Sequence, residues 1–262
     1  MANKEKVFLF DMDGTLTPAR ERIDRSVITA LIRLSKHAKI GVVTGSDYDY
    51  VMQQMGVAFE IGGISCDRID ILPCNGTKKY EFGTGKNFEM VSSVDMIEEL
   101  GQENYNKILR FCSGWQWQIM VEHRDLPFTG TFFQYRTSLL NWCPIGRAAS
   151  LEQRSAWNQA DEKQKIRESY SVLLQSKLLE HNINATAALG GSTSFDIYPV
   201  GWDKTFALKH YKDHEVWFAG DKCDAGGNDY HLYEALRSTG RSFKVSDPAD
   251  TIALIDRFID GL

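Results

Sequence analysis

The sequence lacks the features that mark disulfide-stabilised, membrane-spanning and nucleic-acid-binding proteins. Its five cysteines are scattered and include no C-x-x-C pair, so neither a disulfide framework nor a zinc site is indicated. No apolar stretch approaches the roughly 18 to 20 residues of a membrane-spanning helix, and the first apolar run, Val7 to Phe10, is too short for a signal-peptide core. A net charge of −5 without a long basic block gives no surface for nucleic acid or anionic membrane. We therefore expect a cytoplasmic protein with no nucleic-acid or membrane partner.

What the chain does contain is typical of a folded protein with a substantial core. Its 262 residues are 43% hydrophobic and 25% charged, which disfavours wholesale disorder and fibrous structures. At roughly 150 residues per domain, this length allows one large domain or two smaller ones.

Both ends of the chain alternate strand-like and helix-like segments. Short apolar runs at Val7–Phe10, Ile40–Val43 and Ile69–Leu72 are typical of buried strands. Glu215–Ala219 and Ser242–Val245 continue the pattern near the end of the chain. Such alternation predicts an α/β fold, with a parallel sheet covered by helices on both faces.

The middle of the chain follows a different pattern, in which helices and strands are segregated. Long amphipathic stretches run from Asp95 to about Ser113 and from Ser150 to about His181, with strand candidates at Thr131–Tyr135 and Leu139–Trp142 between them. This arrangement indicates an α+β domain inserted into the α/β core. We predict a core formed by residues 1–81 and 188–262 and an inserted domain at 82–187.

The most informative motif places two carboxylates, Asp11 and Asp13, where the first strand ends. The carboxyl ends of parallel strands form the ligand crevice of an open sheet, and Gly14 permits a sharp exit from the strand. One carboxylate can attack phosphorus while its neighbour handles the proton on the departing oxygen. A hard cation such as Mg²⁺ would relieve the repulsion between the two acids. A plain Asp-Gly turn or a calcium loop is the alternative, although a calcium loop lies between helices.

Three further motifs stand at the edges of predicted elements. Gly220-Asp221, followed by Asn228-Asp229, adds carboxylates after another strand. Thr44-Gly45-Ser46 can hold a phosphate through a hydroxyl and through helix N-terminal N–H groups, and Lys204 supplies a point charge. Taken singly, capping residues and a solvated lysine would explain the last two. All of the motifs together, in this order, favour a phosphoryl-transfer site.

The motif set resembles that of the haloacid dehalogenase (HAD) superfamily of phosphotransferases, whose fold is a Rossmann-like core with an inserted cap. Longer strings are similar to the eukaryotic-type phosphomannomutases and span nearly the whole chain: Phe10 to Arg20, Asn141 to Arg147, Ser194 to Asp196 and Gly201 to Lys204. The resemblance implies a phosphohexomutase that interconverts mannose 6-phosphate and mannose 1-phosphate, with glucose phosphates as further candidates. It also implies a hexose 1,6-bisphosphate activator, a homodimer formed through the cap, and a place in GDP-mannose biosynthesis.

The resemblance further implies catalytic and metal-binding roles for the matching residues. Asp11 would be the nucleophile that becomes an aspartyl phosphate, and Asp13 would be the general acid/base. The transferring phosphoryl group would be held by Lys204 and by either Ser46 or Thr44. Mg²⁺ would be bound by Asp11, the Asp13 backbone carbonyl and Asp221, with Asn228 and Asp229 supporting it from nearby.

A hexose phosphate mutase must also hold the phosphate that is not reacting, and guanidinium groups suit that bidentate task. By resemblance, the cations for this role are Arg20, Arg136 and Arg147. Ser194 and Asp196 alternate with apolar residues, so they would face the opposite way and hydrogen-bond the sugar or its phosphate. Surface ion pairs and an exposed strand face are the alternative explanations.

The chain departs from the family pattern at three places. Thr129 stands where the family carries another phosphate-binding arginine, Cys74 stands where it usually has a glutamate, and Ala235 removes the carboxylate of a loop thought to hold a second cation. We therefore do not extend the family's second cation site to this chain, and we keep a Mg²⁺-dependent sugar-phosphate phosphatase of the same superfamily as the alternative function. A third interpretation, a non-catalytic binding protein, is disfavoured because the acids and the lysine of the site are intact.

Overall fold

The computed structural model describes residues 4–60 and 64–261, which form two compact units. The core unit extends to Ser93 and resumes at Trp202, and the inserted unit covers Val94–Gly201. The predicted α/β class is confirmed, because the core unit contains a largely parallel sheet with helices on both faces. No helix within the described residues is long and apolar enough to cross a membrane.

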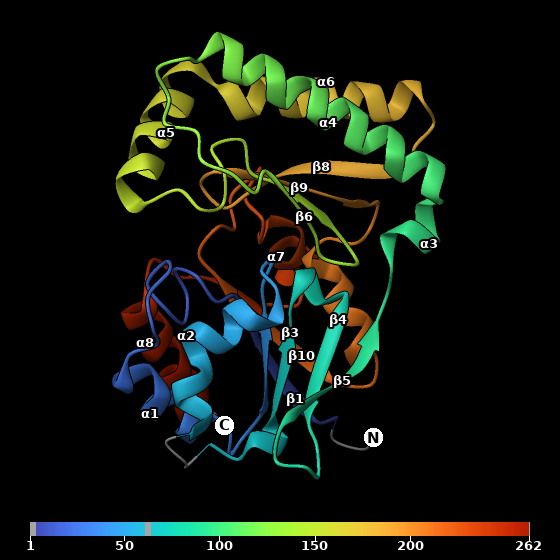
Figure 1. Cartoon of the computed structure of the whole chain (residues 1–262). Coiled ribbons are helices and arrows are strands. Elements are labelled where there is room, and N and C mark those ends of the chain that lie inside the picture. The colour runs from blue at the N-terminus through green and yellow to red at the C-terminus, as the bar shows by residue number, and fades with distance from the viewer. Residues whose placement is uncertain (1–3, 61–63, 262) are drawn as a thin grey trace. The chain divides into compact units, whose positions relative to one another are not determined.

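The core unit is built on a sheet with the strand order β11-β10-β1-β2-β3-β4-β5 (Figure 1). The strands from β11 to β3 pair in parallel, and β4 and β5 form an antiparallel hairpin at one edge. The strands are β1 (Lys6–Phe10), β2 (Lys39–Val43), β3 (Ile69–Leu72), β4 (Lys78–Phe82), β5 (Phe88–Ser93), β10 (Glu215–Gly220) and β11 (Ser242–Lys244). The helical segments are α1 (Arg25–Leu34), α2 (Tyr48–Glu60), η1 (Cys66–Arg68), η2 (Cys74–Gly76), η3 (Lys204–Tyr211), α7 (Tyr230–Arg237) and α8 (Pro248–Asp260).

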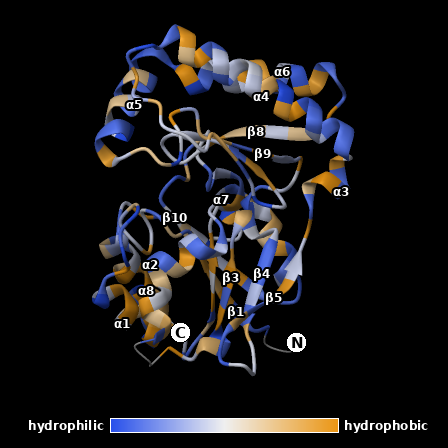
Figure 2. Cartoon of the chain, viewed as in Figure 1, coloured by the Kyte–Doolittle hydropathy of each residue, from blue (hydrophilic) through white to orange (hydrophobic). Residues whose placement is uncertain are grey.

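Strand β1 is buried on both faces, which explains its continuous apolar sequence. Phe8 and Phe10 pack with α1, α2 and α8 on one face, whereas Val7 and Leu9 pack with η3 and α7 on the other. Helices from the two ends of the chain therefore meet: Figure 1 shows α1 in blue beside α8 in red. In Figure 2, β1 and β3 carry the orange, apolar colouring, whereas β4 at the edge hairpin is largely blue. Both halves of the chain are needed to bury β1.

The inserted unit packs helices against one face of an antiparallel sheet with the strand order β6-β7-β9-β8. Trp142 and Phe195 stack with ring centroids 4.4 Å apart on that face, and the Trp142 indole N–H donates to Gln116 Oε1 of the long helix at 2.7 Å. The strands are β6 (Phe133–Tyr135), β7 (Leu140–Trp142), β8 (Ala185–Gly190) and β9 (Ser194–Pro199), and the helices are α3 (Met96–Leu100), α4 (Gln102–Glu122), α5 (Leu151–Gln164) and α6 (Ile166–Glu180).

The boundaries between the units differ from those expected at residues 81 and 187. Residues 82–93 belong to the core unit because β5 pairs with β4 at the edge of its sheet. Residues 188–201 belong to the inserted unit because β9 pairs with both β7 and β8. The strand pairing of these segments, rather than their composition, decides to which unit they belong.

The two long helical stretches expected in the inserted unit are each interrupted. The first divides into α3 and α4 at Gly101, and the second divides into α5 and α6 at Lys165, which has a left-handed φ of +56°. At the second break, Asp161 Oδ1 accepts the Arg167 N–H at 2.7 Å, which satisfies a main-chain donor at the start of α6. Amphipathic spacing alone does not reveal such breaks, because the apolar face continues across them.

Candidate active site

Carboxylates from separate segments of the core unit converge at one edge of its sheet. Asp11 follows β1, Asp221 follows β10 and Asp229 precedes α7, and one oxygen of each lies within 4.8 Å of the others. Because β1 and β10 are parallel neighbours, their carboxyl ends deliver two of these acids to the same edge. The Asp11 N–H donates to the Ala219 carbonyl at 2.9 Å and fixes the exit of the chain from β1.

Glycines leave the space that these carboxylates occupy. Gly14 has a φ of +90°, and a Cβ atom at this position would lie 2.5 Å from Asp221 Oδ2. A Cβ atom at Gly220 would lie 2.6 Å from Asp229 Oδ2. Any larger residue at either position would push a carboxylate out of the cluster. The glycines of both sequence motifs are therefore part of the site geometry.

The Lys204 ammonium compensates part of this negative charge. Its fully buried Nζ forms ion pairs with Asp11 Oδ1 and, at 2.6 Å, with Asp229 Oδ1. Lys204 begins η3, whose N-cap Asp203 accepts the Thr205 N–H at 2.8 Å. Burial lowers the pKa of Lys204, but the two carboxylates outweigh burial and hold that pKa above its ordinary value. The lysine is therefore a fixed positive charge beside Asp11.

The acids still outnumber this cation, and the protonation of Asp11 reflects the imbalance. Burial raises the pKa of Asp11 to about 7 against the lowering effect of Lys204, and the charges of Asp229 and Asp221 add to the rise. Burial also raises the pKa of Asp221. Hard oxygen donors with uncompensated negative charge fit a divalent cation such as Mg²⁺. Asp11, Asp221 and Asp229 are the residues that could hold it, whereas Asn228 is exposed.

Asp13 is held by helix α2 in an arrangement that sequence reasoning missed. Its Oδ1 accepts the Tyr50 hydroxyl at 3.1 Å and the Gln54 Nε2 at 3.2 Å. The buried Gln54 in turn accepts the Thr17 hydroxyl at 2.7 Å, which connects α2 back to the loop after β1. Burial and then the Asp13 charge raise the pKa of Tyr50 to about 12, so its hydroxyl remains a donor. The i, i+4 spacing of Tyr50 and Gln54 was the available signal, since it places both on one helix face.

Arg20 contacts Asp13 through its backbone rather than through its guanidinium. The Arg20 N–H donates to Asp13 Oδ1 at 3.1 Å. Arg20 is exposed, and its backbone has a left-handed φ of +66°. The loop after β1 therefore closes on Asp13. The third donor to Oδ1 fixes the carboxylate further.

The Thr44-Gly45-Ser46 turn lies at the end of β2, next to β1. Thr44 is buried, and its hydroxyl oxygen accepts the Ser46 N–H at 3.1 Å, so it stabilises the turn itself. The Thr44 and Ser46 carbonyls accept the N–H groups of Asn75 and Cys74, at 2.8 Å each, which joins this turn to η2. Ser46 is half-buried. Of the two hydroxyls, that of Ser46 is therefore the better placed to reach a ligand.

In the inserted unit, the polar residues expected to bind the sugar phosphate gather on the sheet face opposite Trp142 and Phe195. Asn141 pairs with Asp196 across β7 and β9, and its Nδ2 donates to Asp196 Oδ1 at 2.7 Å. Arg147 Nη1 donates to Asn141 Oδ1 at 2.9 Å. Burial raises the pKa of Asp196 in spite of the opposing charges of Arg136 and Arg147. Both guanidinium groups therefore lie close to Asp196.

Ser194 lies two residues before Asp196 and so shares its strand face, while Phe195 and Ile197 are fully buried on the other face. Arg136 follows β6, is 7% exposed, and donates to Gln134 Oε1 at 3.2 Å from Nη2. Asp196 and the two arginines leave one net positive charge. The cluster can therefore receive an anionic group.

Thr129 has no positive charge with which to replace the phosphate-binding arginine of the family pattern. Its hydroxyl donates to the Ile145 carbonyl at 3.1 Å, and its N–H donates to the same oxygen at 2.9 Å. The residue thus ties the segment before β6 to the loop that carries Arg147. Its function here is local and structural.

Comparison with known proteins assigns the chain to a family. The family model of eukaryotic phosphomannomutases matches residues 27–260. The chain belongs to this family. The phosphomannomutase of Schizosaccharomyces pombe is 35% identical over 257 residues, which cover 96% of this chain and 93% of the relative. Human phosphomannomutase 1 is 34% identical over 254 residues, which cover 95% and 90%. The chain is thus an enzyme of the eukaryotic phosphomannomutase family.

Solved structures resemble this phosphomannomutase-family chain in fold. A truncated, IMP-bound IMP-nucleotidase of Plasmodium falciparum has a TM-score of 0.67 at 15% identity and covers 98% of this chain and 68% of that one. The trehalose-6-phosphate phosphatase of Aspergillus fumigatus has a TM-score of 0.52 at 15% identity, covering 98% and 93%. At this identity the likeness concerns the fold alone, and it agrees with the HAD fold class expected from the motifs.

Proposed function

We propose that this enzyme interconverts mannose 6-phosphate and mannose 1-phosphate through an aspartyl phosphate at Asp11. The observation that carries the proposal is the buried cluster in which Lys204 pairs with Asp11 and Asp229 beside Asp221. An acid in this position is suited to attack phosphorus, because the neighbouring lysine offsets the charge of the phosphoryl group. Membership of the phosphomannomutase family over nearly the whole chain supports mannose phosphates as the substrates.

In the proposed reaction, the phosphoryl group of phosphorylated Asp11 passes to the free hydroxyl of the hexose phosphate, and Asp13 takes the proton of that hydroxyl. After the resulting bisphosphate has reoriented, an Asp11 oxygen forms a bond to its other phosphorus as the bond from that phosphorus to the sugar oxygen breaks, and Asp13 gives its proton to the departing oxygen. The Tyr50 and Gln54 donors on Oδ1 orient this carboxyl group. A hexose 1,6-bisphosphate arises as the intermediate, and a trace of it primes Asp11.

Residues at the acid cluster would hold a Mg²⁺ ion. Asp11, Asp221 and Asp229 offer carboxylate oxygens, and the Asp13 backbone carbonyl is a further candidate. When bound, the ion would neutralise charge on the phosphoryl oxygens. Lys204 would contact the same group from its fixed position next to Asp11.

We assign the non-reacting phosphate to Arg136 and Arg147, and the sugar hydroxyls to Ser194 and Asp196. Arg147 is braced by Asn141, and Asp196 is braced by the same amide, so one asparagine orients a cation and an acceptor together. Bidentate guanidinium groups suit a phosphate dianion. The exposed Arg20 is a further cation available for this role.

We further propose a homodimer formed through the inserted unit and a cytoplasmic enzyme of mannose metabolism that supplies GDP-mannose biosynthesis. The first is supported by apolar side chains exposed along α4, namely Trp117, Met120 and Val121. The cytoplasmic location is supported by the cysteines, because all five lie in the described part of the chain and none of them forms a disulfide.

A sugar-phosphate phosphatase is the second candidate, favoured by Thr129. Its hydroxyl is engaged with the Ile145 carbonyl, and it adds no positive charge where the family pattern has an arginine. A weaker hold on the non-reacting phosphate would let water, instead of a sugar hydroxyl, attack the aspartyl phosphate, which would then be hydrolysed to free Asp11 and inorganic phosphate.

Phosphorus NMR distinguishes the two reactions directly. Mannose 1-phosphate is incubated with the enzyme, Mg²⁺ and a trace of hexose 1,6-bisphosphate. We expect the mannose 6-phosphate signal to grow with little inorganic phosphate. Inorganic phosphate without the isomer would refute the mutase and establish the phosphatase.

A further inference from the structure

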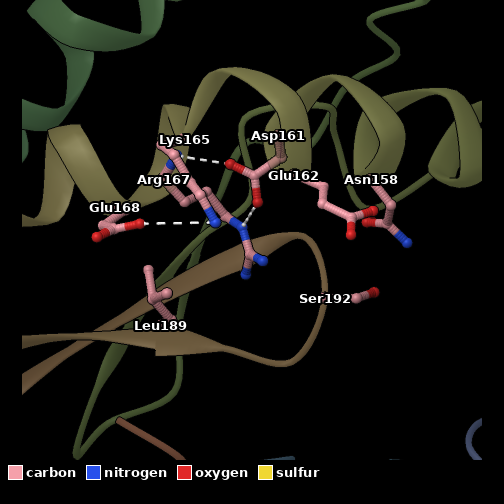
Figure 3. A pocket seen from close by; sticks show the side chains of 8 residues that line it. All are labelled: Asn158, Asp161, Glu162, Lys165, Arg167, Glu168, Leu189 and Ser192. Atoms are coloured by element: carbon pink, nitrogen blue, oxygen red, sulfur yellow. Dashed lines mark hydrogen bonds and ion pairs between the residues drawn. The ribbon is translucent and has the colours of Figure 1, made fainter.

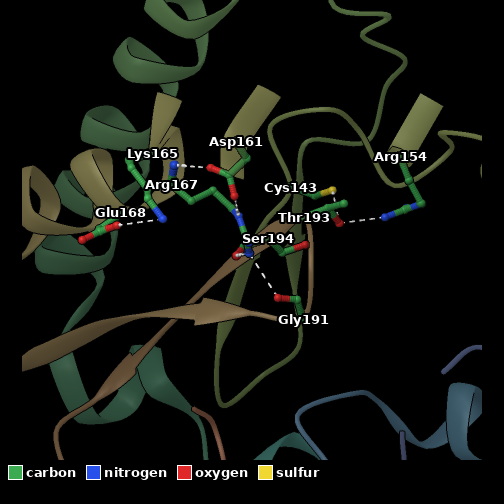
Figure 4. A network of polar contacts seen from close by, with 9 residues as sticks. All are labelled: Cys143, Arg154, Asp161, Lys165, Arg167, Glu168, Gly191, Thr193 and Ser194. Atoms are coloured by element: carbon green, nitrogen blue, oxygen red, sulfur yellow. Dashed lines mark hydrogen bonds and ion pairs between the residues drawn. The ribbon is translucent and has the colours of Figure 1, made fainter. Parts of the chain in front are cut away.

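Arg154 of helix α5 is a buried arginine that joins two segments of the proposed sugar-phosphate site. It is 6% exposed, and its guanidinium donates in three directions. Nε donates to the Ala149 carbonyl at 3.1 Å, Nη1 donates to the Thr193 hydroxyl at 2.7 Å, and Nη2 donates to the Arg147 carbonyl at 2.8 Å. Figure 4 shows Arg154 reaching Thr193, which also receives the Cys143 thiol at 3.6 Å.

These contacts brace residues on either side of the cluster around Asp196. Arg147 is the cation next to Asn141, and Thr193 directly precedes Ser194 at the start of β9. A planar guanidinium has its donors in a fixed arrangement, so holding one acceptor fixes where the others must lie. The position of the Arg147 backbone is therefore tied to that of the β8–β9 turn through a single side chain.

A second arginine holds the same turn in a different way. Arg167 pairs with Asp161 at 2.7 Å and donates from Nη1 to the carbonyls of Gly191 at 3.1 Å and Ser194 at 3.3 Å. It lines a cavity of about 400 Å³ at the junction of α5 and α6, beside Leu189 and Ser192 (Figure 3). Its contacts stop at the turn and do not reach the Arg147 loop. Arg154 is the side chain that bonds to both segments in the network of Figure 4.

We propose that Arg154 is a positioning residue, which sets the distance between Arg147 and Ser194 so that the inserted unit can bind a hexose phosphate. The inference rests on the proposed function only in taking a sugar phosphate as the ligand. Arg154 itself contacts the Arg147 carbonyl and the Thr193 hydroxyl, and it acts through these groups. A side chain that cannot make both bonds at once would therefore displace Arg147 and Ser194 together.

The test measures binding of mannose 1-phosphate by calorimetry in an Asp11→Asn background, where no turnover occurs. Arg154→Lys keeps the charge but loses the fork, and we expect its dissociation constant to rise about tenfold, the scale on which a small misplacement acts. Thr193→Val removes one acceptor with little change of shape and should weaken binding by about threefold to tenfold. The double variant should bind no more weakly than Arg154→Lys, because both changes break the same connection.

Gln175→Ala is the matched control. Gln175 bonds α6 to the Ala185 carbonyl and the Ala187 N–H, in the same unit and away from Arg147 and Ser194. It should lower the thermal midpoint of the protein while leaving the dissociation constant within about twofold. In the Asp11-containing enzymes, Arg154→Lys should raise KM for mannose 1-phosphate more than it lowers kcat.

The outcomes separate this inference from the mutase proposal. If the parent protein releases phosphate without forming the isomer but Arg154→Lys still binds about tenfold more weakly, the inference stands and the mutase assignment fails. Unchanged binding in both Arg154→Lys and Thr193→Val overturns the inference, as does an equal loss in Gln175→Ala. A parent that does not bind mannose 1-phosphate overturns both.

Discussion

Lys204 and Asp11 carry opposite charges inside the core unit, so the protonation of each depends on the other. The lysine stays charged because two carboxylates surround it and raise its pKa. Burial and the acidic neighbours of Asp11 raise the pKa of that carboxyl group, which favours its neutral form. A nucleophilic carboxylate must be ionised, so the burial of Asp11 opposes the form that the proposed reaction requires. A divalent cation would correct this by favouring the ionised form.

The pH dependence of stability in EDTA should report this state of Asp11. Its pKa is about 7 in the folded protein, against an ordinary value of 3.8. Because the folded value is the higher one, the contribution of Asp11 to stability is complete below pH 4 and is lost as the pH rises to about 7. Urea unfolding from pH 4.5 to 8 should therefore show this loss in the parent and not in Asp11→Asn. Added Mg²⁺ should stabilise the parent more at pH 8 than at pH 5.

Identical pH profiles of the two proteins in EDTA would contradict the assignment of the raised pKa to Asp11. A Mg²⁺ effect that is equal in the parent and in Asp11→Asn would place the ion elsewhere.

Tyr50→Phe should slow proton transfer by Asp13, because one of the donors that orient Oδ1 is removed. We expect kcat for mannose 1-phosphate to fall about tenfold, within the range that general acid/base catalysis contributes. Turnover of p-nitrophenyl phosphate, whose leaving group needs no proton, should fall much less. Tyr48→Phe is the control: Tyr48 lies in the same turn of α2 as Tyr50, but its ring stacks on Tyr80 of β4, with ring centroids 4.3 Å apart. Equal losses with both substrates would show that Tyr50 supports the fold rather than Asp13.

Several core-unit residues that sequence reasoning found stand at the end of an element. Asp11 and Asp221 directly follow β1 and β10, and Lys204 begins η3; the meeting of the two acids follows from the parallel pairing of their strands. Tyr50 and Gln54 were missed because their role depends on which face of α2 points to Asp13. Arg154 was missed for a similar reason, as its acceptors are backbone and hydroxyl groups that no motif identifies.

At the scale of elements, the loop from β1 determines how the acids meet. The Gly14 N–H donates to the Thr17 carbonyl at 2.7 Å, and the Thr251 hydroxyl of α8 donates to the Thr15 carbonyl at 2.8 Å. The loop is therefore held by a helix from the other end of the chain. Asp221 packs against the bare Cα of Gly14, so the loop and the end of β10 are fitted to each other.

Gly14→Ala should displace Asp221 and weaken Mg²⁺ binding, since the new Cβ would lie 2.5 Å from its carboxylate. We expect about a tenfold loss in Mg²⁺ affinity, the lower end of the effect of disturbing groups around a metal. Gly240→Ala is the control: its φ of +70° imposes similar backbone strain, but no atom lies within 4 Å of the added methyl group. Calorimetric titration of Mg²⁺ measures both. Equal Mg²⁺ affinities in the two variants would show that Asp221 does not bind the metal.

The strands were largely predictable from sequence, because short apolar runs between turns have few alternatives. Ile69–Leu72 agrees at both ends, and β1 and β2 differ by one residue at the start. The β4–β5 hairpin was not predicted as part of the core sheet, since its sequence is polar and half-exposed. Its place is set by pairing with β3, a long-range contact that local periodicity does not encode.

At the scale of the whole molecule, the exposed apolar residues of α4 are the surface through which we expect two copies to associate. Trp117 is 69% exposed, with Met120 and Val121 one turn further along the helix. Trp117→Glu should convert a dimer into a monomer in sedimentation equilibrium, because burying an unpaired charge in an interface is costly. Leu151→Glu is the matched control, at a residue 74% exposed on another helix. A dimer that survives Trp117→Glu would place the interface elsewhere.

The core sheet also has a consequence for the time course of synthesis. Lys6 of β1 pairs with Glu215 of β10, and the two are separated by 209 positions (215 − 6). At about 5–20 residues per second, β1 waits roughly 10–40 s for its neighbour to be made. The inserted unit is continuous in sequence and is complete before β10 emerges. During that interval the apolar edge of β1 lacks its permanent partner, so the nascent chain is the stage at which this enzyme is most exposed to aggregation and to capture by chaperones.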